Sequence, residues 1–147
     1  MRELNYKFFL HLLFIISFSS NVFSDSSKII KNLKIEKGFS IEIFAENIVT
    51  PRQIAESDSG NIFVGSRSGG TVSVIDNNKN IRVIAKGLSN STGVTYHDGD
   101  LYFSEVNSIW KISNIDEALL SSELMPNKVL VTNNLPSDTH HGWKWID

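Results

Sequence analysis

Short stretches that alternate apolar and polar residues recur along most of the chain, each followed by a cluster of turn-forming residues. Residues 38–44 (GFSIEIF) alternate with period two, which is typical of a half-buried strand. Further short strands are predicted at 62–64, 71–75 and 81–85. The breaks between them carry Gly, Asn, Asp and Ser, which accept positive φ or cap their own turn. The pattern therefore predicts an all-β fold built from short strands.

The order of strands and turns then repeats. Three pairs of segments match one another, namely 58–64 with 97–103, 71–75 with 108–112, and 83–88 with 130–135. A four-stranded unit that recurs every ~40 to 50 residues is the sequence signature of a β-propeller blade. Within residues 38–147 we therefore expect one blade at 52–88, a second at 91–135 and the inner strand of a third at 141–147.

The second blade contains an insertion that fits a short helix. Asn114 stands at the position of a helix cap, Glu117 follows three residues later, and residues 118–120 (ALL) continue the helix. We expect this helix on the rim of the second blade, between its third and fourth strands, with no chemical role.

Two blades and a strand cannot close a ring, since propellers close with about four to eight blades around a channel. Each blade buries its faces against its neighbours, so the outer faces would stay uncovered. We therefore expect this chain to be the N-terminal part of a longer propeller, inactive by itself.

The first residues predict export. Arg2 and Lys7 form a basic start, residues 8–18 are an apolar run, and a small polar stretch ends at Ser24. This order is typical of a secretory signal peptide, here 1–24, with cleavage near Ser24. The apolar run is shorter than the ~20 residues of a membrane span, although an uncleaved anchor is the alternative. After cleavage we expect a secreted or periplasmic protein without a membrane span, in which 25–37 form a polar leader.

Composition excludes several classes of function. A formal net charge of −2 gives no electrostatic footprint for nucleic acid or an anionic membrane. The absence of cysteine excludes disulfides, thiolate metal sites and cysteine nucleophiles. The sequence also lacks a dinucleotide-binding glycine motif, a phosphate-binding loop and a serine nucleophile elbow.

The richest chemistry lies in residues 135–147 (LPSDTHHGWKWID). His140 and His141 stand side by side at the end of a polar loop, just before an alternating aromatic run. A neutral imidazole is the commonest general base in proteins. Either histidine could equally be a loop residue, and we expect Trp143 or Trp145 to pack in the core.

Several segments together resemble the glucose/sorbosone dehydrogenase family. They are residues 38–45 (GFSIEIFA), 60–67 (GNIFVGSR), 93–94 with 98–102, and 135–144 (LPSDTHHGWK), of which the last is the most specific. Members of that family are exported, soluble six-bladed propellers that use pyrroloquinoline quinone, usually with calcium. The resemblance implies oxidation of an aldose or an aldehyde hydrate, with electrons passed to an external acceptor.

The resemblance also implies residue roles. His141 matches the family's general base best, which takes the hydroxyl proton while hydride leaves for the quinone. His140 departs from the glucose branch, where an acidic residue precedes the base, and is closer to the sorbosone branch. It could orient the cofactor or face solvent. The family's calcium ligands and later cofactor residues lie in blades that residues 38–147 do not include.

Two arginines could hold a cofactor carboxylate. We expect Arg67 to open a loop of the first blade and Arg52 to end the loop entering it, at the same mouth of the channel as His141. Each could instead form a surface ion pair. Glu105 and Asn107 occupy the equivalent loop of the second blade.

Two other functions fit the same architecture. A calcium-dependent lactonase would need acidic residues converging on a metal, and the early candidates are Glu46, Glu56 and Glu105. A non-catalytic binding propeller is the third possibility, because fold does not fix function.

Overall fold

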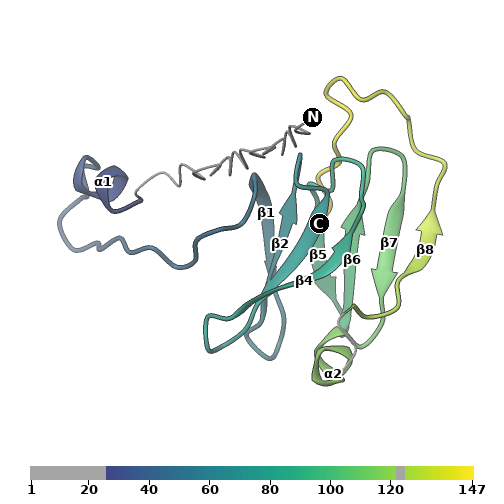
Figure 1. The fold of residues 1–147 in the computed structure, drawn as a ribbon, viewed down its shortest axis with the longest axis horizontal. Coiled ribbons are helices and arrows are strands. Elements are labelled where there is room, and N and C mark those ends of the chain that lie inside the picture. The colour runs from purple at the N-terminus through teal and green to yellow at the C-terminus, as the bar shows by residue number, and fades with distance from the viewer. Residues whose placement is uncertain (1–25, 122–124) are drawn as a thin grey trace, which may run out of the picture.

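Two four-stranded antiparallel sheets carry most of the chain in the computed structural model, which describes residues 26–121 and 125–147 (Figure 1). The predicted signal peptide at 1–24 lies outside these residues. The first sheet has the order β1-β2-β3-β4, with β1 at Pro51–Glu56, β2 at Ile62–Ser66, β3 at Thr71–Ile75 and β4 at Ile81–Lys86. The second has the order β5-β6-β7-β8, with β5 at Val94–His97, β6 at Asp100–Ser104, β7 at Ile109–Ile112 and β8 at Val129–Thr132. Two short helices, α1 at Ser26–Lys31 and α2 at Ile115–Leu120, complete the elements.

Local turn chemistry accounts for the hairpins that the repeat predicted. His97 pairs with Asp100, so Asp98 and Gly99 form a two-residue connection between β5 and β6. Their φ angles are 49° and 85°. A two-residue hairpin of type I′ requires positive φ at both central residues, and Asp-Gly is a favoured sequence for it.

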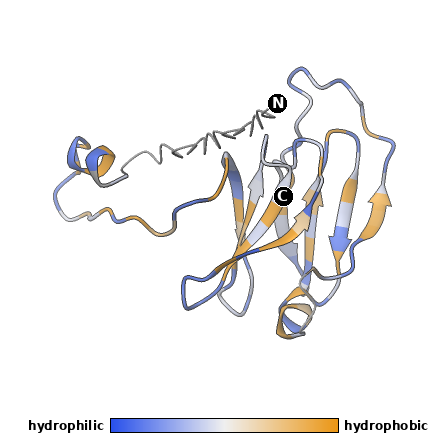
Figure 2. Ribbon diagram, viewed as in Figure 1, coloured by the Kyte–Doolittle hydropathy of each residue, from blue (hydrophilic) through white to orange (hydrophobic). Residues whose placement is uncertain are grey.

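The two sheets pack against each other through a shared core. Phe63 on β2 and Phe103 on β6 are both 0% exposed, and Val72, Leu101 and Ile112 join them in one cluster. Burying a side chain of this size contributes about 1.5 to 3 kcal/mol. Figure 2 shows the apolar residues concentrated along the strands and in α2, with hydrophilic residues at the turns. Residues from both sheets therefore form a single hydrophobic core.

Helix α2 joins the two sheets at the end away from the C-terminal loop (Figure 1). Ile115 is fully buried, and the Asp116 carboxylate accepts hydrogen bonds of 2.8 Å from Ser57 Oγ and from Asn61 Nδ2 of the first sheet. Arg82 Nη2 of β4 donates to the Leu119 carbonyl at 3.0 Å. The predicted helix is confirmed, and its role is to fix the second sheet to the first.

Asn114 is the N-cap residue of this helix as predicted, but the capping hydrogen bond expected from its side chain does not form. Asn114 has a left-handed backbone with φ 46°, and its side chain makes no capping hydrogen bond. Its backbone N–H donates instead to Asp100 Oδ1 at 3.0 Å. The tight turn after β7 thus holds Asn114 in the left-handed region, which asparagine adopts more readily than most residues.

The strand predicted at 38–44 is also wrong. This segment forms no strand, and Phe39, Ile41 and Ile43 are 77%, 44% and 39% exposed. An alternating pattern becomes a strand only when a neighbouring strand completes its hydrogen bonds, and no described strand pairs with this segment. The expected leader at 25–37, by contrast, contains helix α1.

The inner strand expected at 141–147 does not form within the described residues. The structure has a turn at His140 and His141 and no strand in residues 142–147. As with residues 38–44, no described strand pairs with this segment to complete its hydrogen bonds.

The two sheets are blades of a β-propeller, and the chain forms part of one. The inner strands β1 and β5 contact each other, and the strands of each blade follow one another outward in chain order. Prediction of the all-β class from the sequence is thus confirmed. Neither helix of residues 26–121 and 125–147 is long and apolar enough to cross a membrane.

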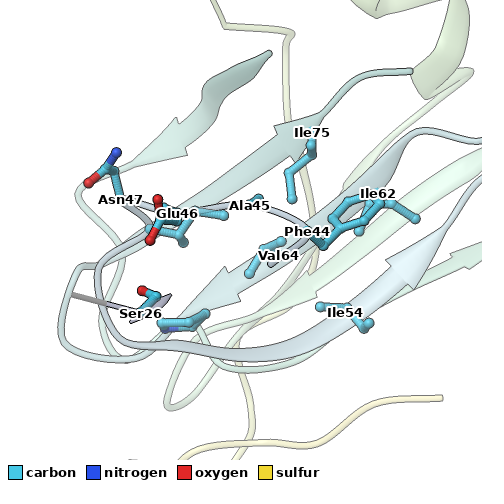
Figure 3. A pocket seen from close by; sticks show the side chains of 11 residues that line it. Ser26, Phe44, Ala45, Glu46, Asn47, Ile54, Ile62, Val64 and Ile75 are labelled. Carbon is cyan, nitrogen blue, oxygen red and sulfur yellow. The ribbon is translucent and has the colours of Figure 1, made fainter. Parts of the chain in front are cut away.

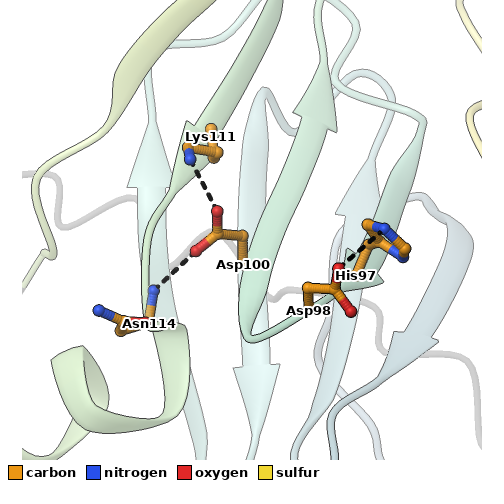
Figure 4. A network of polar contacts seen from close by, with 5 residues as sticks. All are labelled: His97, Asp98, Asp100, Lys111 and Asn114. Carbon is orange, nitrogen blue, oxygen red and sulfur yellow. Dashed lines mark hydrogen bonds and ion pairs between the residues drawn. The ribbon is translucent and has the colours of Figure 1, made fainter.

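A polar network ties β6 to β7 and to the turn before α2 (Figure 4). Lys111 Nζ lies 2.7 Å from Asp100 Oδ2, while the Asn114 N–H reaches the other carboxylate oxygen. The hydrogen bond from Lys111, followed by that from Asn114, lowers the pKa of Asp100 from 3.8 against the opposing effect of burial. The same pair raises the pKa of Lys111 from 10.5.

We expect Asp100 to make the stability of the fold pH-dependent in acid. Because its pKa is lower in the folded state, its contribution is present above the unfolded pKa and is lost as pH falls through the folded pKa. The contribution of Lys111 is lost at the other extreme, as pH rises through its raised pKa. Urea unfolding from about pH 5 to pH 2 should show a flatter profile for Asp100→Asn than for the unaltered protein.

Asp98→Asn is the matched control for this measurement. Its carboxylate is 89% exposed and lies beside His97 on the neighbouring turn. If Asp98→Asn flattened the pH dependence of unfolding as much as Asp100→Asn does, the Asp100 network would not be its cause.

Candidate functional site

The two adjacent histidines occupy the centre of a tight turn. The Gly142 N–H donates to the Thr139 carbonyl at 3.4 Å, which closes the turn around His140 and His141. His141 has a φ of 56°, a left-handed conformation that costs a residue with a side chain about 1 to 2 kcal/mol. Backbone outliers of this kind cluster at functional sites, and this one supports a functional hypothesis for His141.

Gly142 is required by close packing of the turn. A Cβ atom at this position would lie 1.6 Å from the carbonyl oxygen of Asp138. Lys144 adds a second restraint, because its Nζ donates to the Gly142 carbonyl at 2.5 Å and to the Pro136 carbonyl at 3.4 Å. Sequence reasoning placed Lys144 on a strand and missed this role.

An aromatic and cationic cluster extends from the turn to the first blade. The rings of His140 and His141 meet edge to face, with centroids 4.3 Å apart. The ring centroids of His141 and Trp143 are 5.1 Å apart, and the Arg67 guanidinium lies 4.2 Å from the centroid of a Trp143 ring. The structure thus brings three of the predicted site residues together, and we call these four side chains the His–Trp–Arg cluster.

Thr50 holds the loop that carries Arg67. The Arg67 N–H donates to the Thr50 carbonyl at 3.2 Å, and Thr50 Oγ1 accepts hydrogen bonds from the N–H groups of Ser68 and Gly69 at 3.1 and 3.3 Å. Thr50 itself has a φ of 45°, which is an outlier for a β-branched residue. Nothing in the local sequence marks Thr50 for this role, so sequence reasoning missed it.

Arg52 stands at the same end of the first blade but outside the cluster. It lies within β1 and not in the preceding loop, at the point where the pairing of β1 with β2 shifts register. Pro51, which precedes Arg52, pairs with Ser66, which precedes Arg67, so Arg52 lies near the start of the loop that carries Arg67. Its side chain is exposed and has no hydrogen bond or ion pair to another described residue.

Trp143 and Trp145 differ in burial. Trp143 is half-buried under Arg67, whereas Trp145 is 71% exposed. Neither belongs to the hydrophobic core cluster, so the prediction that one of them packs in the core is wrong, and Trp143 packs instead against Arg67 and His141.

The other candidate side chains have structural partners. Glu105 accepts hydrogen bonds of 2.6 Å from the Ser89 N–H with one oxygen and from Trp110 Nε1 with the other. Asn107 Oδ1 accepts from Ser108 Oγ at 3.0 Å. Among the described residues, no three His, Cys, Asp or Glu side chains come together as a metal site.

A separate apolar cavity of about 600 Å³ lies on the first blade (Figure 3). It is bounded by the segment from Phe44 to Ile48 and by Ile54, Ile62 and Ile75 of the sheet. None of the four predicted site residues lines it. The hydrophobic cavity and the His–Trp–Arg cluster are thus distinct surfaces.

Comparison with known proteins supports the fold without assigning a function. No protein-family model matches the chain. An uncharacterized protein of Borreliella burgdorferi is 38% identical over 104 residues, which cover 70% of this chain and 27% of that protein. The chain therefore spans about a quarter of the length of this relative.

Two solved propeller structures are similar at 17% identity. The structure of a streptogramin B lyase matches with a TM-score of 0.51 over 65% of this chain and 31% of that one. The PQQ-bound aldose sugar dehydrogenase of Streptomyces coelicolor matches with a TM-score of 0.43 over 61% of this chain and 32% of that one. At this identity the first match supports the propeller fold alone.

We expect Trp143 to contribute more to stability than Trp145. Trp143→Leu removes the ring that contacts Arg67 and His141, which should cost about 1 kcal/mol for the cation–π contact plus the lost packing. Trp145→Leu alters an exposed side chain, so its change should stay within about 0.5 kcal/mol. Urea unfolding of both variants measures the difference, and equal losses would contradict the half-buried position of Trp143.

Gly142→Ala should disrupt the histidine turn. The added methyl group meets the Asp138 carbonyl, so the turn must open, at a cost of about 1 to 3 kcal/mol. The ring-current shift of the His141 Cε1 proton, measured by NMR, should be reduced as the ring leaves Trp143. Ser137→Ala, an exposed change in the same loop, is the control, and a preserved shift in Gly142→Ala would show that the turn tolerates a side chain.

Proposed function

We propose that this chain is part of a quinoprotein sugar or sorbosone dehydrogenase, which oxidises an aldose or an aldehyde hydrate. The observation that carries the proposal is the His–Trp–Arg cluster. It joins the segment 135–144, the most specific part of the resemblance to that family, to Arg67 of the first blade. Cluster residues that are 70 or more positions apart thus meet at one surface.

His141 is the general base in this proposal. Its side chain is exposed and has no hydrogen bond to another described residue, so its ring nitrogens are accessible to a substrate hydroxyl. A neutral imidazole takes the proton of the substrate hydroxyl while a hydride leaves the carbon that carries this hydroxyl. That carbon becomes the carbonyl carbon of a lactone or an acid. The tight turn fixes the backbone of His141, so its ring stays close to Trp143.

The residues near His141 fit pyrroloquinoline quinone, which is planar and carries carboxylates. Arg67 and Arg52 are two guanidinium groups at the same end of the blade, and neither has an ion pair with a described acidic residue. Guanidinium groups bind carboxylates in a bidentate manner. His140, edge to face with His141, lies where it would orient the cofactor. When bound, the quinone supplies the acceptor for the hydride.

Calcium does not fit the described residues. Calcium takes six to eight oxygen ligands, and the Glu105 carboxylate is already engaged by Ser89 and Trp110. Secretion or export to the periplasm, a sugar or aldehyde substrate and an external electron acceptor belong to the same proposal.

Cofactor binding tests this proposal directly. Addition of pyrroloquinoline quinone should quench the tryptophan fluorescence of the protein, because the cofactor would sit beside Trp143. Arg67→Ala should weaken the apparent affinity by about tenfold or more, the loss expected for a charged hydrogen bond of ~1.5 to 3 kcal/mol. Arg82→Ala is the control, because Arg82 binds helix α2 at the opposite end of the blades.

Catalysis is tested with the intact gene product. Reduction of a dye by the quinone-loaded protein with aldose or aldehyde should be lost in His141→Ala and retained in His97→Ala. His97 lies beside Asp98 on the far turn, with 3.3 Å between Nε2 and Oδ2. Binding without dye reduction would indicate a non-catalytic propeller, and hydrolysis of a lactone without quinone binding would indicate the lactonase alternative.

A further inference from the structure

Residues 144–146 lie against both blades although they form no strand. Ser104 Oγ of β6 donates to the Lys144 carbonyl at 3.0 Å. Gln53 Nε2 of β1 donates to the Ile146 carbonyl at 2.6 Å. The two anchoring side chains come from different blades, so the segment bridges β1 of the first blade and β6 of the second.

The first anchor is built into the second blade. Ser104 is 0% exposed and accepts a hydrogen bond from the Gly93 N–H at 2.9 Å, which orients its hydroxyl toward Lys144. A Cβ atom at position 93 would lie 2.5 Å from the Lys144 carbonyl oxygen. Gly93 therefore lets the bridging segment approach the blade closely.

The second anchor is a buried amide with an unusual environment. Gln53 is 5% exposed, and its Oε1 has no hydrogen-bond partner among the described residues. A buried acceptor without a partner lowers stability, so an apolar side chain of similar volume would suit the site better for stability alone. The hydrogen bond to Ile146 is the interaction that an apolar replacement would lose.

The anchored residues 144–146 follow the histidines and Trp143 of the His–Trp–Arg cluster directly in sequence. Lys144 is fixed through its carbonyl by Ser104, while its ammonium holds the Gly142 carbonyl at 2.5 Å. Trp143 lies between these two fixed residues and reaches the Arg67 guanidinium. The position of the Trp143 and His141 rings thus depends on where residues 144–146 are held.

We propose that Gln53 is a positioning residue, which holds the 144–146 segment across the two blades and so keeps the Trp143 ring under Arg67 and beside His141. The role of His141 as a base rests on the proposed function, whereas the positioning itself does not. Gln53 acts on the cluster through its hydrogen bond to the Ile146 carbonyl.

The test compares two variants that remove side-chain hydrogen bonds at opposite ends of the blades. Gln53→Met keeps the volume and removes the donor to Ile146. Ser57→Ala removes the hydrogen bond to Asp116 at the far end of the blades. We expect Gln53→Met, but not Ser57→Ala, to lose most of the ring-current shift of the His141 Cε1 proton and of the Trp143 indole N–H in NMR spectra.

Ser104→Ala provides a second, independent variant, since it removes the anchor at Lys144 and should reduce the same two shifts. Unchanged shifts in Gln53→Met would overturn the proposal, as would equal losses in Ser57→Ala. The spectra are recorded without cofactor or substrate. A protein that fails to bind the quinone would therefore contradict the proposed function while leaving the positioning role of Gln53 intact.

Discussion

Burial of one blade against the other is the constraint on which the rest of this structure depends. A single four-stranded sheet has two faces, and only a neighbouring layer can cover an apolar face. Phe63 and Phe103 come from different blades and are both fully buried, so neither blade would keep its core alone. Polar links between the blades add to this apolar packing. Asp116 of α2 joins them at one end, and the 144–146 segment joins them at the other.

The candidate site follows from that packing. Arg67 belongs to the first blade, while the histidines and Trp143 follow the second, so the cluster exists only where the blades are aligned. Thr50, Ser104 and Gln53 hold the segments on either side of it through backbone groups. The side chains of His140 and His141 remain exposed on this framework, which is the arrangement expected when a rigid scaffold carries functional loops.

Features encoded in short segments were predictable from the sequence. The Asp98-Gly99 hairpin, the repeat of strand and turn, and the helix from Ile115 to Leu120 all depend on residues within one element. The segment at 38–44 shows the limit of such reasoning, because its alternation is real but no described strand pairs with it. For the candidate site, the residue types and their position near one end of the blades were predictable. The roles of Thr50, Gln53 and Lys144 were not, because their partners are backbone carbonyls and amides whose positions no local pattern encodes.

The hydrogen bond from Gln53 to Ile146 spans 93 positions along the chain. Contacts between distant residues form late in folding, because the entropy of closing the long loop must first be offset by other interactions. The hairpins of each blade are local and can form early. We therefore expect the surface that carries His141 and Trp143 to be organised last, after both blades have folded and met.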